Sequence, residues 1–283
     1  MKTEPMDREA QLLGLAIVVP VFNQLAYTKG CLDSLRDAGL PDSKILVINN
    51  GSTDGTRDFL AGRPELKVIH NAENRGCGFA WNQGVNAAPA TWTVLLNNDV
   101  LVPPGCIEGL ISFAQEGAFD VVCPALREGD LDYNWPSYAT EFVRSLARAK
   151  RSGVAHGVCF MVQRRVFNAL GGFDDDPRLG GYEDDEFFRR ARRHGFRLAI
   201  TGKAFIHHFG SVTQKSIAAA MNRPGTSLGD RAYYRRKSGQ TWAKRKGLQL
   251  RDNLRAAWWV VTERLRYGHT LREKRVEGRW RCG

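Results

Sequence analysis

The sequence predicts an α/β fold in which helices flank a mostly parallel sheet. Short apolar runs, rich in valine, isoleucine and leucine, alternate with segments of helical periodicity through residues 15–100. Such strand–helix alternation in short units is typical of parallel sheets. The chain has 283 residues, of which 43% are hydrophobic, so it can form one large domain, or one domain with an appendage.

Each apolar run of this half ends in a polar turn. Buried strands are predicted at residues 15–23, 44–48, 66–69 and 91–96, with helical segments between the first three. The first ends in Pro-Val-Phe-Asn, and the second runs into Asn-Asn-Gly-Ser-Thr-Asp-Gly. Because the carboxyl ends of parallel strands meet at one edge of a sheet, we expect these turns to form a single site.

The strand at 91–96 stops at Asn97, Asn98 and Asp99. A carboxylate at the carboxyl end of a strand is well placed to hold a hard divalent cation, which commonly accompanies phosphate. The alternative is an ordinary turn, because asparagine and aspartate are common turn residues.

Residues 74–84 contain two closely spaced glycines, Gly76 and Gly78. These glycines permit close approach of the backbone to an anion, and a helix beginning near Gly78 would direct its amino terminus at that anion. A dinucleotide-binding loop is another interpretation, but its three-glycine pattern is absent.

The second half of the chain holds further candidate groups. Acidic residues 183–186 follow Gly-Gly-Tyr and offer a general base, or they form a solvated helix start that the helix dipole favours. His207 and His208 end an apolar run and are either metal ligands or core residues. The aromatic segment 130–136, which contains Trp135, is a lid, a substrate platform or an ordinary surface loop.

Charge and cysteine usage exclude several classes of protein. The net charge is +11, but residues 231–283 hold 16 Lys/Arg against 4 Asp/Glu and the rest is nearly neutral, so nucleic-acid binding by the whole domain is not expected. We find no signal-peptide pattern, and no apolar run approaches the ~20 residues that span a bilayer. The six cysteines lack paired spacing, which favours a reducing, cytoplasmic compartment over a zinc site or disulfide framework.

These turns together resemble the motifs of the family 2 glycosyltransferases, which have the GT-A fold. The matching stretches, in the family's order, are residues 19–23, 49–56, 74–84, 97–99, 171–174, 183–190 and 208–213. The resemblance implies a GT-A domain over residues 14–215, with a nucleotide-binding half (14–100) and an acceptor half (101–215). A tail, residues 1–13, precedes it, and a basic, tryptophan-containing helical extension, residues 216–283, follows.

The resemblance implies an inverting sugar transferase, similar to rhamnosyltransferases and other enzymes of surface-polysaccharide synthesis. Such an enzyme moves a sugar from a UDP- or dTDP-linked donor to a hydroxyl of a glycan or lipid-linked acceptor. Carried over to this sequence, the nucleotide-binding residues are Pro20, Phe22, Asn23, Asn49, Asn50, Asp54, Asn74, Gly76, Gly78, Asn82, Asn97 and Asn98. The expected acceptor residues, from the aromatic segment and the family's acceptor loop, are Trp135, Gly172, Phe173 and Asp174.

The same resemblance assigns a divalent cation and a base. Asp99 and His208 would hold Mn²⁺ or Mg²⁺, and a histidine ligand favours Mn²⁺. Asp184 is the expected base, with Asp185 as the second choice and Glu183 in the same motif.

Two positions depart from the family pattern. Asn49 stands where the family usually has an aspartate that contacts the base, so the nucleotide preference stays open, and Asn97 replaces the first acid of the metal motif. A catalytically inactive nucleotide-sugar-binding or partner module is an alternative, although such a copy need not retain the metal and base residues. A sugar-nucleotide pyrophosphorylase is a further alternative, but that class needs a Gly-rich basic loop where this chain has Val-Phe-Asn-Gln at 21–24.

The basic extension carries the last sequence-based hypothesis. Residues 254–267 can form a helix with a tryptophan-bearing apolar side, and basic helices of this kind lie on anionic membrane surfaces. The prediction is peripheral attachment to the cytoplasmic face of a membrane through residues 231–283. The alternative is a helix packed on the catalytic domain with a solvated basic face.

Overall fold

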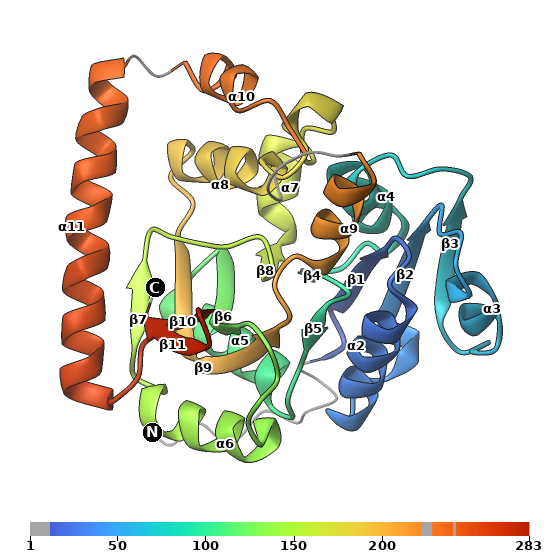
Figure 1. The fold of residues 1–283 in the computed structure, drawn as a ribbon, viewed down its shortest axis with the longest axis horizontal. Coiled ribbons are helices and arrows are strands. Elements are labelled where there is room, and N and C mark those ends of the chain that lie inside the picture. The colour runs from blue at the N-terminus through green and yellow to red at the C-terminus, as the bar shows by residue number, and fades with distance from the viewer. Residues whose placement is uncertain (1–11, 222–227, 240–241, 283) are drawn as a thin grey trace.

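The computed structural model describes residues 12–221, 228–239 and 242–282 (Figure 1). These residues form one mixed sheet of eleven strands, whose main path has the order β11-β10-β6-β8-β4-β1-β2-β3. One hydrophobic core lies on each face of the sheet, beneath the flanking helices. The predicted α/β class and its helix-flanked sheet are confirmed.

The amino-terminal half is the parallel sheet that the sequence predicts. β1 pairs in parallel with β2 on one side and β4 on the other, and β2 pairs with β3. Ile17 and Val19 of β1 enter one core and Val18 the other, and this burial on both faces explains the continuous apolar runs. The elements are β1 (Leu15–Val21), α2 (Leu25–Asp37), η1 (Asp42–Lys44), β2 (Ile45–Asn50), α3 (Thr56–Ala61), β3 (Lys67–Asn71), α4 (Cys77–Ala87) and β4 (Trp92–Leu96).

The second half extends the sheet with strands of both directions. β8 runs antiparallel to β4, whereas β6 and β9 run parallel to each other over most of their length. The short strands β5 and β7 both pair with β9. The elements are β5 (Val100–Leu101), α5 (Cys106–Gly117), β6 (Val121–Glu128), α6 (Trp135–Leu146), β7 (Lys150–Ser152), β8 (Cys159–Gln163), α7 (Arg164–Leu170), η2 (Pro177–Leu179), α8 (Glu183–Arg193), β9 (Leu198–His208) and α9 (Val212–Ala220).

The carboxyl-terminal extension is only partly helical, which corrects the sequence-based expectation. After α10 (Arg231–Lys237) and α11 (Trp242–Tyr267), the chain forms a hairpin of β10 (Arg272–Val276) and β11 (Arg279–Cys282). The two turn residues, Glu277 and Gly278, have φ of 52° and 74°, as a tight two-residue hairpin requires. β10 pairs in parallel with residues 126–128 of β6, so the hairpin joins the main sheet.

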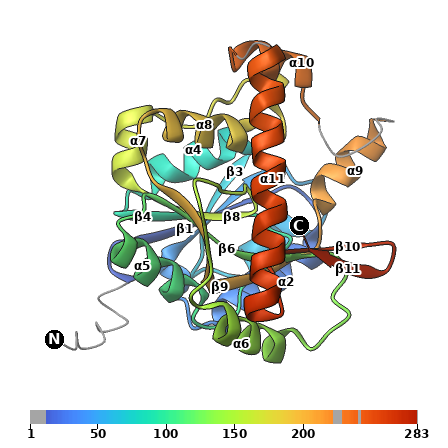
Figure 2. The ribbon, with the colours of Figure 1, turned by 90° about the vertical axis from the view of Figure 1, so that its left-hand side faces the viewer.

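Helix α11 runs along the outside of the molecule (Figures 1 and 2). Its attachment includes a buried ion pair, in which Arg151 Nε of β7 donates to Glu263 Oε1 at 2.8 Å. Glu263 Oε2 also accepts the backbone N–H of Leu271 at 2.8 Å. In the described part of the chain, no helix is long and apolar enough to cross a membrane.

Candidate functional site

A cleft opens at the carboxyl edge of the sheet, where β1, β2 and β4 end. The start of α4, the loop before α8 and helix α9 form its other walls. Its lining includes these residues of the predicted nucleotide and metal motifs: Pro20, Phe22, Asn50, Asn74, Gly76, Asn97, Asn98 and Asp99. The expectation that the strand-end turns converge on one site is met for these residues.

Three other residues of the predicted nucleotide set instead connect the turns to one another. Asn23 Oδ1 accepts the backbone N–H of Thr53 at 2.7 Å, which joins the β1 turn to the β2 turn. Asp54 Oδ2 accepts the N–H at the start of α2, at 3.2 Å, and Asn49 Nδ2 contacts the His70 ring at 3.0 Å. None of the three is among the residues that line the described cleft.

Asn50 holds the glycine loop in place. Its Nδ2 donates to Asn74 Oδ1 at 2.9 Å and to the Gly76 carbonyl at 3.1 Å. Gly76 has φ of 88°, a conformation that favours glycine. At Gly78 a Cβ would lie 3.2 Å from the Asp174 carbonyl and 3.4 Å from Glu183 Cβ, so this glycine lets the acceptor loop and α8 come close.

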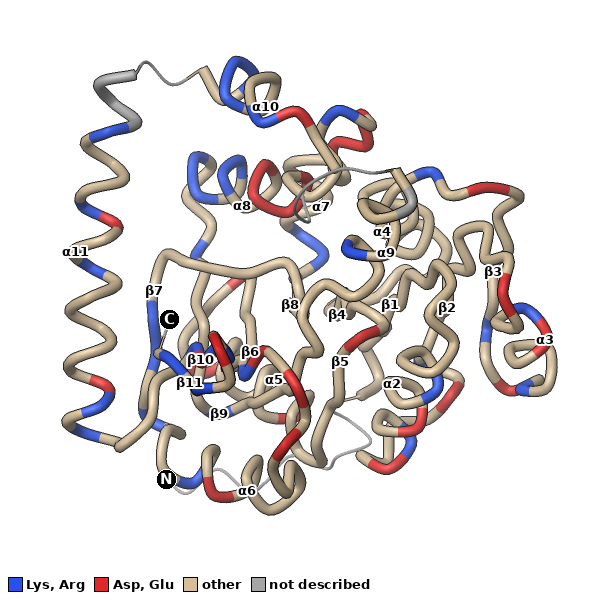
Figure 3. The backbone as a smooth tube through the Cα atoms, in the orientation of Figure 1, with Lys and Arg blue, Asp and Glu red and all other residues tan. Residues whose placement is uncertain are grey.

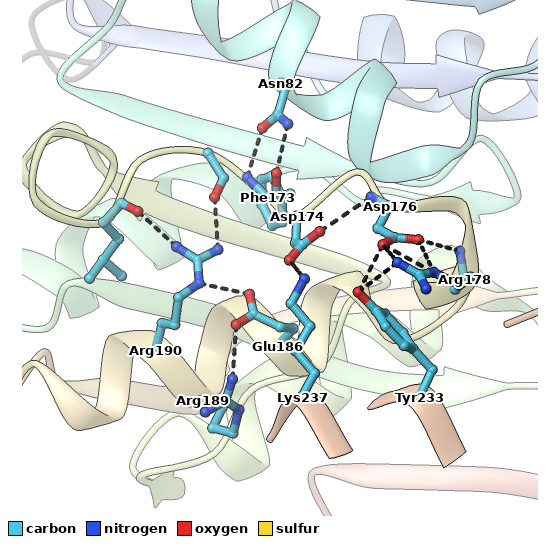
Figure 4. A network of polar contacts seen from close by, with 12 residues as sticks. Asn82, Phe173, Asp174, Asp176, Arg178, Glu186, Arg189, Arg190, Tyr233 and Lys237 are labelled. Carbon is cyan, nitrogen blue, oxygen red and sulfur yellow. Dashed lines mark hydrogen bonds and ion pairs between the residues drawn. The ribbon is translucent and has the colours of Figure 1, made fainter. Parts of the chain in front are cut away.

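The structure corrects two predicted contacts. Asn82, expected at the nucleotide, uses its amide on the backbone of Phe173: Oδ1 accepts that N–H at 2.7 Å, and Nδ2 donates to that carbonyl at 2.8 Å (Figure 4). Phe173, expected at the acceptor, is 4% exposed and packs 4.4 Å from the Phe187 ring and 5.0 Å from the Trp81 ring. Sequence alone does not distinguish an aromatic loop residue that meets a ligand from one that fills the core.

The other acceptor candidates have separate surroundings. Gly172 packs on Asn82, where a Cβ would overlap the amide, and its carbonyl accepts from Arg190 at 2.7 Å. Asp174 forms an ion pair with Lys237 of α10 (Figure 4). Trp135 begins α6 and lies outside the lining of the described cleft.

Asp99 and His208 meet at the base of the cleft. β5 follows Asp99 directly, and its pairing with β9 sets Val100 opposite His208. His208 Nε2 lies 3.4 Å from Asp99 Oδ1, and the backbone N–H of Val212 donates to Asp99 Oδ2 at 3.0 Å. The neighbouring His207 makes its ring contact elsewhere, with the Tyr133 hydroxyl at 2.8 Å.

Glu128, which the sequence reasoning missed, supports His208 from behind. Its Oε2 lies 3.2 Å from His208 Nδ1, and its Oε1 accepts from Lys274 of β10 at 2.6 Å. Burial disfavours charge on His208, but the two carboxylates outweigh it and raise the pKa of His208 to about 9. The hydrogen bond from His208 in turn lowers the pKa of Glu128 to about 2. Its only sequence signal is a strand-end acid, because its partner lies 80 residues along the chain.

The acidic start of α8 borders the same cleft. Glu183 is 6% exposed and lines the cleft, and its Oε2 has no hydrogen-bond partner among the described residues. Asp184 is half-buried against Gly157, where any Cβ would overlap the carboxylate. Val158, the residue after Gly157, accepts the backbone N–H of Asn97 through its carbonyl at 3.0 Å. The loop that Asp184 contacts therefore lies beside the 97–99 turn.

The carboxylates of this cluster differ in their charge environments. Burial, together with the charges of Asp185 and Glu183, raises the pKa of Asp184 to about 7. Burial also raises the pKa of the Cys77 thiol at the start of α4, and the charges of Glu183, Asp184 and Asp99 raise it further. Figure 3 shows acidic positions at the start of α8 and basic positions towards its end.

The model of the "Glycosyl transferase family 2" matches residues 16–171, more than half of the chain. The chain belongs to glycosyl transferase family 2. Among curated relatives, the "Putative glycosyltransferase EpsH" of Bacillus subtilis is 25% identical over 198 residues, which cover 69% of this chain and 52% of EpsH. "Uncharacterized glycosyltransferase EpsJ" of the same organism is 30% identical over 201 residues, 63% of this chain and 57% of EpsJ. This family 2 chain therefore spans little more than half the length of these two relatives.

Solved structures agree on the fold of this family 2 chain. TarS of S. aureus, residues 1–349, superposes with a TM-score of 0.55 at 17% identity, over 70% of this chain and 61% of that one. The mannosyltransferase PcManGT of Pyrobaculum calidifontis, in complex with GDP-Man and Mn²⁺, superposes with a TM-score of 0.51 at 19% identity, over 76% and 65%. The GT-A fold predicted from the motifs is confirmed.

Asp99 and His208 fit a divalent cation as part of a larger ligand set. A carboxylate and an imidazole face each other, and Glu128 on the far ring nitrogen is the outer partner that metal-binding histidines commonly have. Within the described residues, no group of three His, Cys, Asp or Glu side chains is placed to hold a metal by itself. A cation here would therefore take its remaining ligands from water or from a bound phosphate.

Proposed function

We propose that this family 2 chain transfers a sugar from a nucleoside diphosphate sugar to an acceptor hydroxyl, with inversion at the anomeric carbon. The observation that carries the proposal is the single cleft lined by both Asp99, which pairs with His208, and Glu183, the first of the α8 carboxylates, which is followed directly by Asp184. The Asp99–His208 pair could hold the cation that accompanies a diphosphate, and a carboxylate of α8 could act as the base. The loops that hold both come from the carboxyl edge of the sheet, where ligands of such sheets bind.

The donor would lie over the turns after β1, β2 and β4. Two structural neighbours support a nucleotide donor, because TarS has been crystallised with UDP and PcManGT with GDP-Man and Mn²⁺. When bound, a Mn²⁺ or Mg²⁺ ion supplies positive charge to the leaving diphosphate. Asp99 and His208 would hold it, and the imidazole favours Mn²⁺. We keep UDP and dTDP as the proposed carriers, and the test below includes GDP.

Asp184 is the proposed base. The acceptor oxygen attacks the anomeric carbon, the bond from that carbon to the diphosphate oxygen breaks, and the acceptor proton passes to the Asp184 carboxylate. A pKa near 7 suits this role, because a base works best when its pKa lies close to the working pH. Glu183 and Asp185 raise that pKa and are second choices for the base itself.

The acceptor would enter beside the donor. A second cleft shares Gly76, Cys77 and Glu183 with the first, and residues 174–180 form its far wall. We place a glycan or lipid-linked hydroxyl there, in the synthesis of a cell-surface polysaccharide. Helix α10 holds this wall through Lys237 on Asp174 and through the Tyr233 hydroxyl, which donates to Asp176 at 2.8 Å (Figure 4).

Thermal stabilisation by nucleoside diphosphates tests the proposal. We expect UDP, dTDP or GDP to raise the melting temperature of the full chain more with Mn²⁺ present than without, because ligand binding stabilises the folded state by mass action. Asp99→Asn should remove the metal-dependent part of the shift. Hydrolysis of the matching sugar nucleotide should then follow the same metal dependence. The absence of a shift with every nucleotide and metal would overturn the proposal.

A further inference from the structure

Exposed apolar side chains concentrate on α11. Eight large hydrophobic residues are exposed among those described, and five of them lie on this helix: Leu250 (62%), Leu254 (65%), Trp258 (63%), Val261 (55%) and Leu265 (82%). Their spacing of four, four, three and four residues follows the helical repeat, so they form one stripe along the helix axis. We refer to these five residues as the α11 stripe.

The α11 stripe faces away from the rest of the molecule. Glu263, which is 5% exposed, pairs with Arg151 of β7, and Trp259 lies 5.4 Å from the Arg151 guanidinium. On a helical wheel, Glu263 and Trp259 lie on the opposite side from Leu254 and Leu265. α11 lies at the left-hand edge of the molecule in Figure 1, and Figure 2, which views that side, shows it running in front of the other elements.

Basic side chains flank the α11 stripe. Exposed Arg251 and half-buried Arg255 lie along one flank, and exposed Lys246 and Arg264 along the other. The exposed acid Asp252 contacts Arg251 at 3.1 Å and Arg255 at 3.2 Å, and the only other acid of residues 246–267, Glu263, is buried against Arg151. Figure 3 shows the alternation of charge along this helix. The outward face is therefore apolar at its centre and positive at its margins.

The positive margins of the α11 stripe favour an anionic membrane over a second copy of this chain as its binding partner. Pairing of two copies through α11 would bring the basic margins together, and like charges at close range disfavour that contact. An anionic bilayer offers hydrocarbon to the centre and phosphate to the margins. Because no described helix is apolar enough to cross a membrane, α11 would lie in the plane of the interface.

We propose that the α11 stripe binds the surface of anionic membranes. The apolar side chains enter the boundary between head groups and acyl chains, to a depth of ~5–10 Å, while the arginines contact lipid phosphates. This binding uses α11 alone and does not rest on sugar transfer. The packed side of the same helix keeps the domain attached to the membrane surface.

Vesicle binding of the full chain tests the proposal. We expect co-sedimentation with vesicles of phosphatidylcholine containing about one third phosphatidylglycerol, little binding to pure phosphatidylcholine, and weaker binding as salt rises. Trp258→Glu with Leu265→Glu should abolish binding, because both side chains are exposed and the fold does not need them. Lys246→Gln with Arg264→Gln, both exposed on one margin of the stripe, should weaken binding about tenfold or more, at roughly one factor of five per charge.

The matched control places the same charge elsewhere. Leu13 and Leu131 are 77% and 38% exposed and lie outside α11, so Leu13→Glu with Leu131→Glu, which adds the same two charges, should bind vesicles like the unmodified chain. Equal binding by the Trp258/Leu265 variant and the unmodified chain would overturn the proposal. So would a dimer in sedimentation velocity that the same variant dissociates, because the α11 stripe would then be covered by a second copy.

Discussion

Four carboxylates occupy the first turn of α8, and their surroundings give them different properties. Glu186 is buried between Arg189 at 3.0 Å and Arg190 at 2.7 Å, so it has a structural role. Asp185 is exposed, whereas Asp184 lies against Gly157 with a raised pKa. Burial raises the pKa of Glu183, Asp184 and Asp185, and carboxylates perturbed in this way are typical of functional sites.

The first prediction concerns the base. Asp184→Asn should lower the rate of sugar transfer about 10²–10⁴-fold, because the amide cannot accept the acceptor proton. Nucleotide-induced thermal stabilisation should be unchanged, since the donor turns lie on other loops. Glu183→Gln and Asp185→Asn, which remove the second choices for the base, should lower the rate much less in the same assay. Near-normal turnover of the Asp184→Asn variant would show that another group is the base.

The second prediction concerns pH and stability. The pKa of Asp184 is about 7 in the folded chain and about 3.9 in an unfolded one, so the folded state binds an extra proton between these values. The contribution of Asp184 to the free energy of unfolding therefore falls as pH rises through this window. Asp184→Asn should be more stable than the unmodified chain by about 1–2 kcal/mol at about pH 8, after allowance for partial exposure, and nearly equal at about pH 3.5, below the unfolded pKa. Urea denaturation at both values measures the gap, and a gap that does not change with pH contradicts the assignment.

Residues at the ends of strands were the easiest to predict. Asn50, Asn97 and Asp99 follow directly from apolar periodicity, because a strand end in a parallel sheet has a known edge. Asn82 was misassigned because its partner, the Phe173 backbone, is 91 residues away. A contact at that separation depends on how two loops fold together, which no local pattern in the sequence encodes.

At the scale of elements, four strands act together beneath the cleft. β5 pairs with β9, β9 with β6, and β6 with β10, and Asp99, His208, Glu128 and Lys274 follow one another along this series. The register sets Glu128 directly opposite His208. The expected helical extension over residues 216–283 is wrong for residues 272–282, where a tight two-residue turn at Glu277 and Gly278 folds the chain into the β10–β11 hairpin.

The third prediction concerns this series of strands. Glu128→Gln should weaken Mn²⁺ binding about 10–100-fold, because outer partners orient metal-binding histidines and raise their basicity. Electron paramagnetic resonance of free Mn²⁺ measures the affinity directly, without an activity assay. Glu116→Gln is the matched control, since Glu116 pairs with Lys203 on the surface. Unchanged Mn²⁺ affinity in the Glu128→Gln variant would mean that Glu128 only attaches β10, through Lys274, and does not support a metal site.

At the scale of the whole molecule, the carboxyl-terminal extension packs on the domain but leaves the outward side of α11 exposed to solvent. α10 contacts the acceptor loop, β10 joins the sheet, and α11 is attached through Glu263. The two interpretations of residues 231–283, a packed helix and a membrane-binding one, are thus compatible, because they concern opposite sides of α11. The sequence indicated the basic, tryptophan-bearing helix, but not which side packs, since Arg151 lies 112 residues from Glu263.

The fourth prediction concerns whether the carboxyl-terminal extension and the domain unfold as one cooperative unit. Glu263→Ala removes one partner of a buried pair and leaves the Arg151 charge and the Leu271 N–H without that carboxylate. We expect the free energy of unfolding to fall by about 3–5 kcal/mol. The double variant Arg151→Met with Glu263→Leu should recover most of this loss, except about 1 kcal/mol for the backbone hydrogen bond.

Chemical denaturation followed at two positions distinguishes a single folding unit from two. A fluorophore attached to the cysteine of a Leu265→Cys variant reports on α11, because Leu265 is 82% exposed on that helix, and far-ultraviolet circular dichroism reports on the whole chain. If the extension folds with the domain, both signals shift together in Glu263→Ala, because a cooperative unit loses all its structure at one midpoint. An early fluorescence transition with an unchanged main transition would instead show that α11 detaches first. The membrane-binding face would then belong to a separately folding helix.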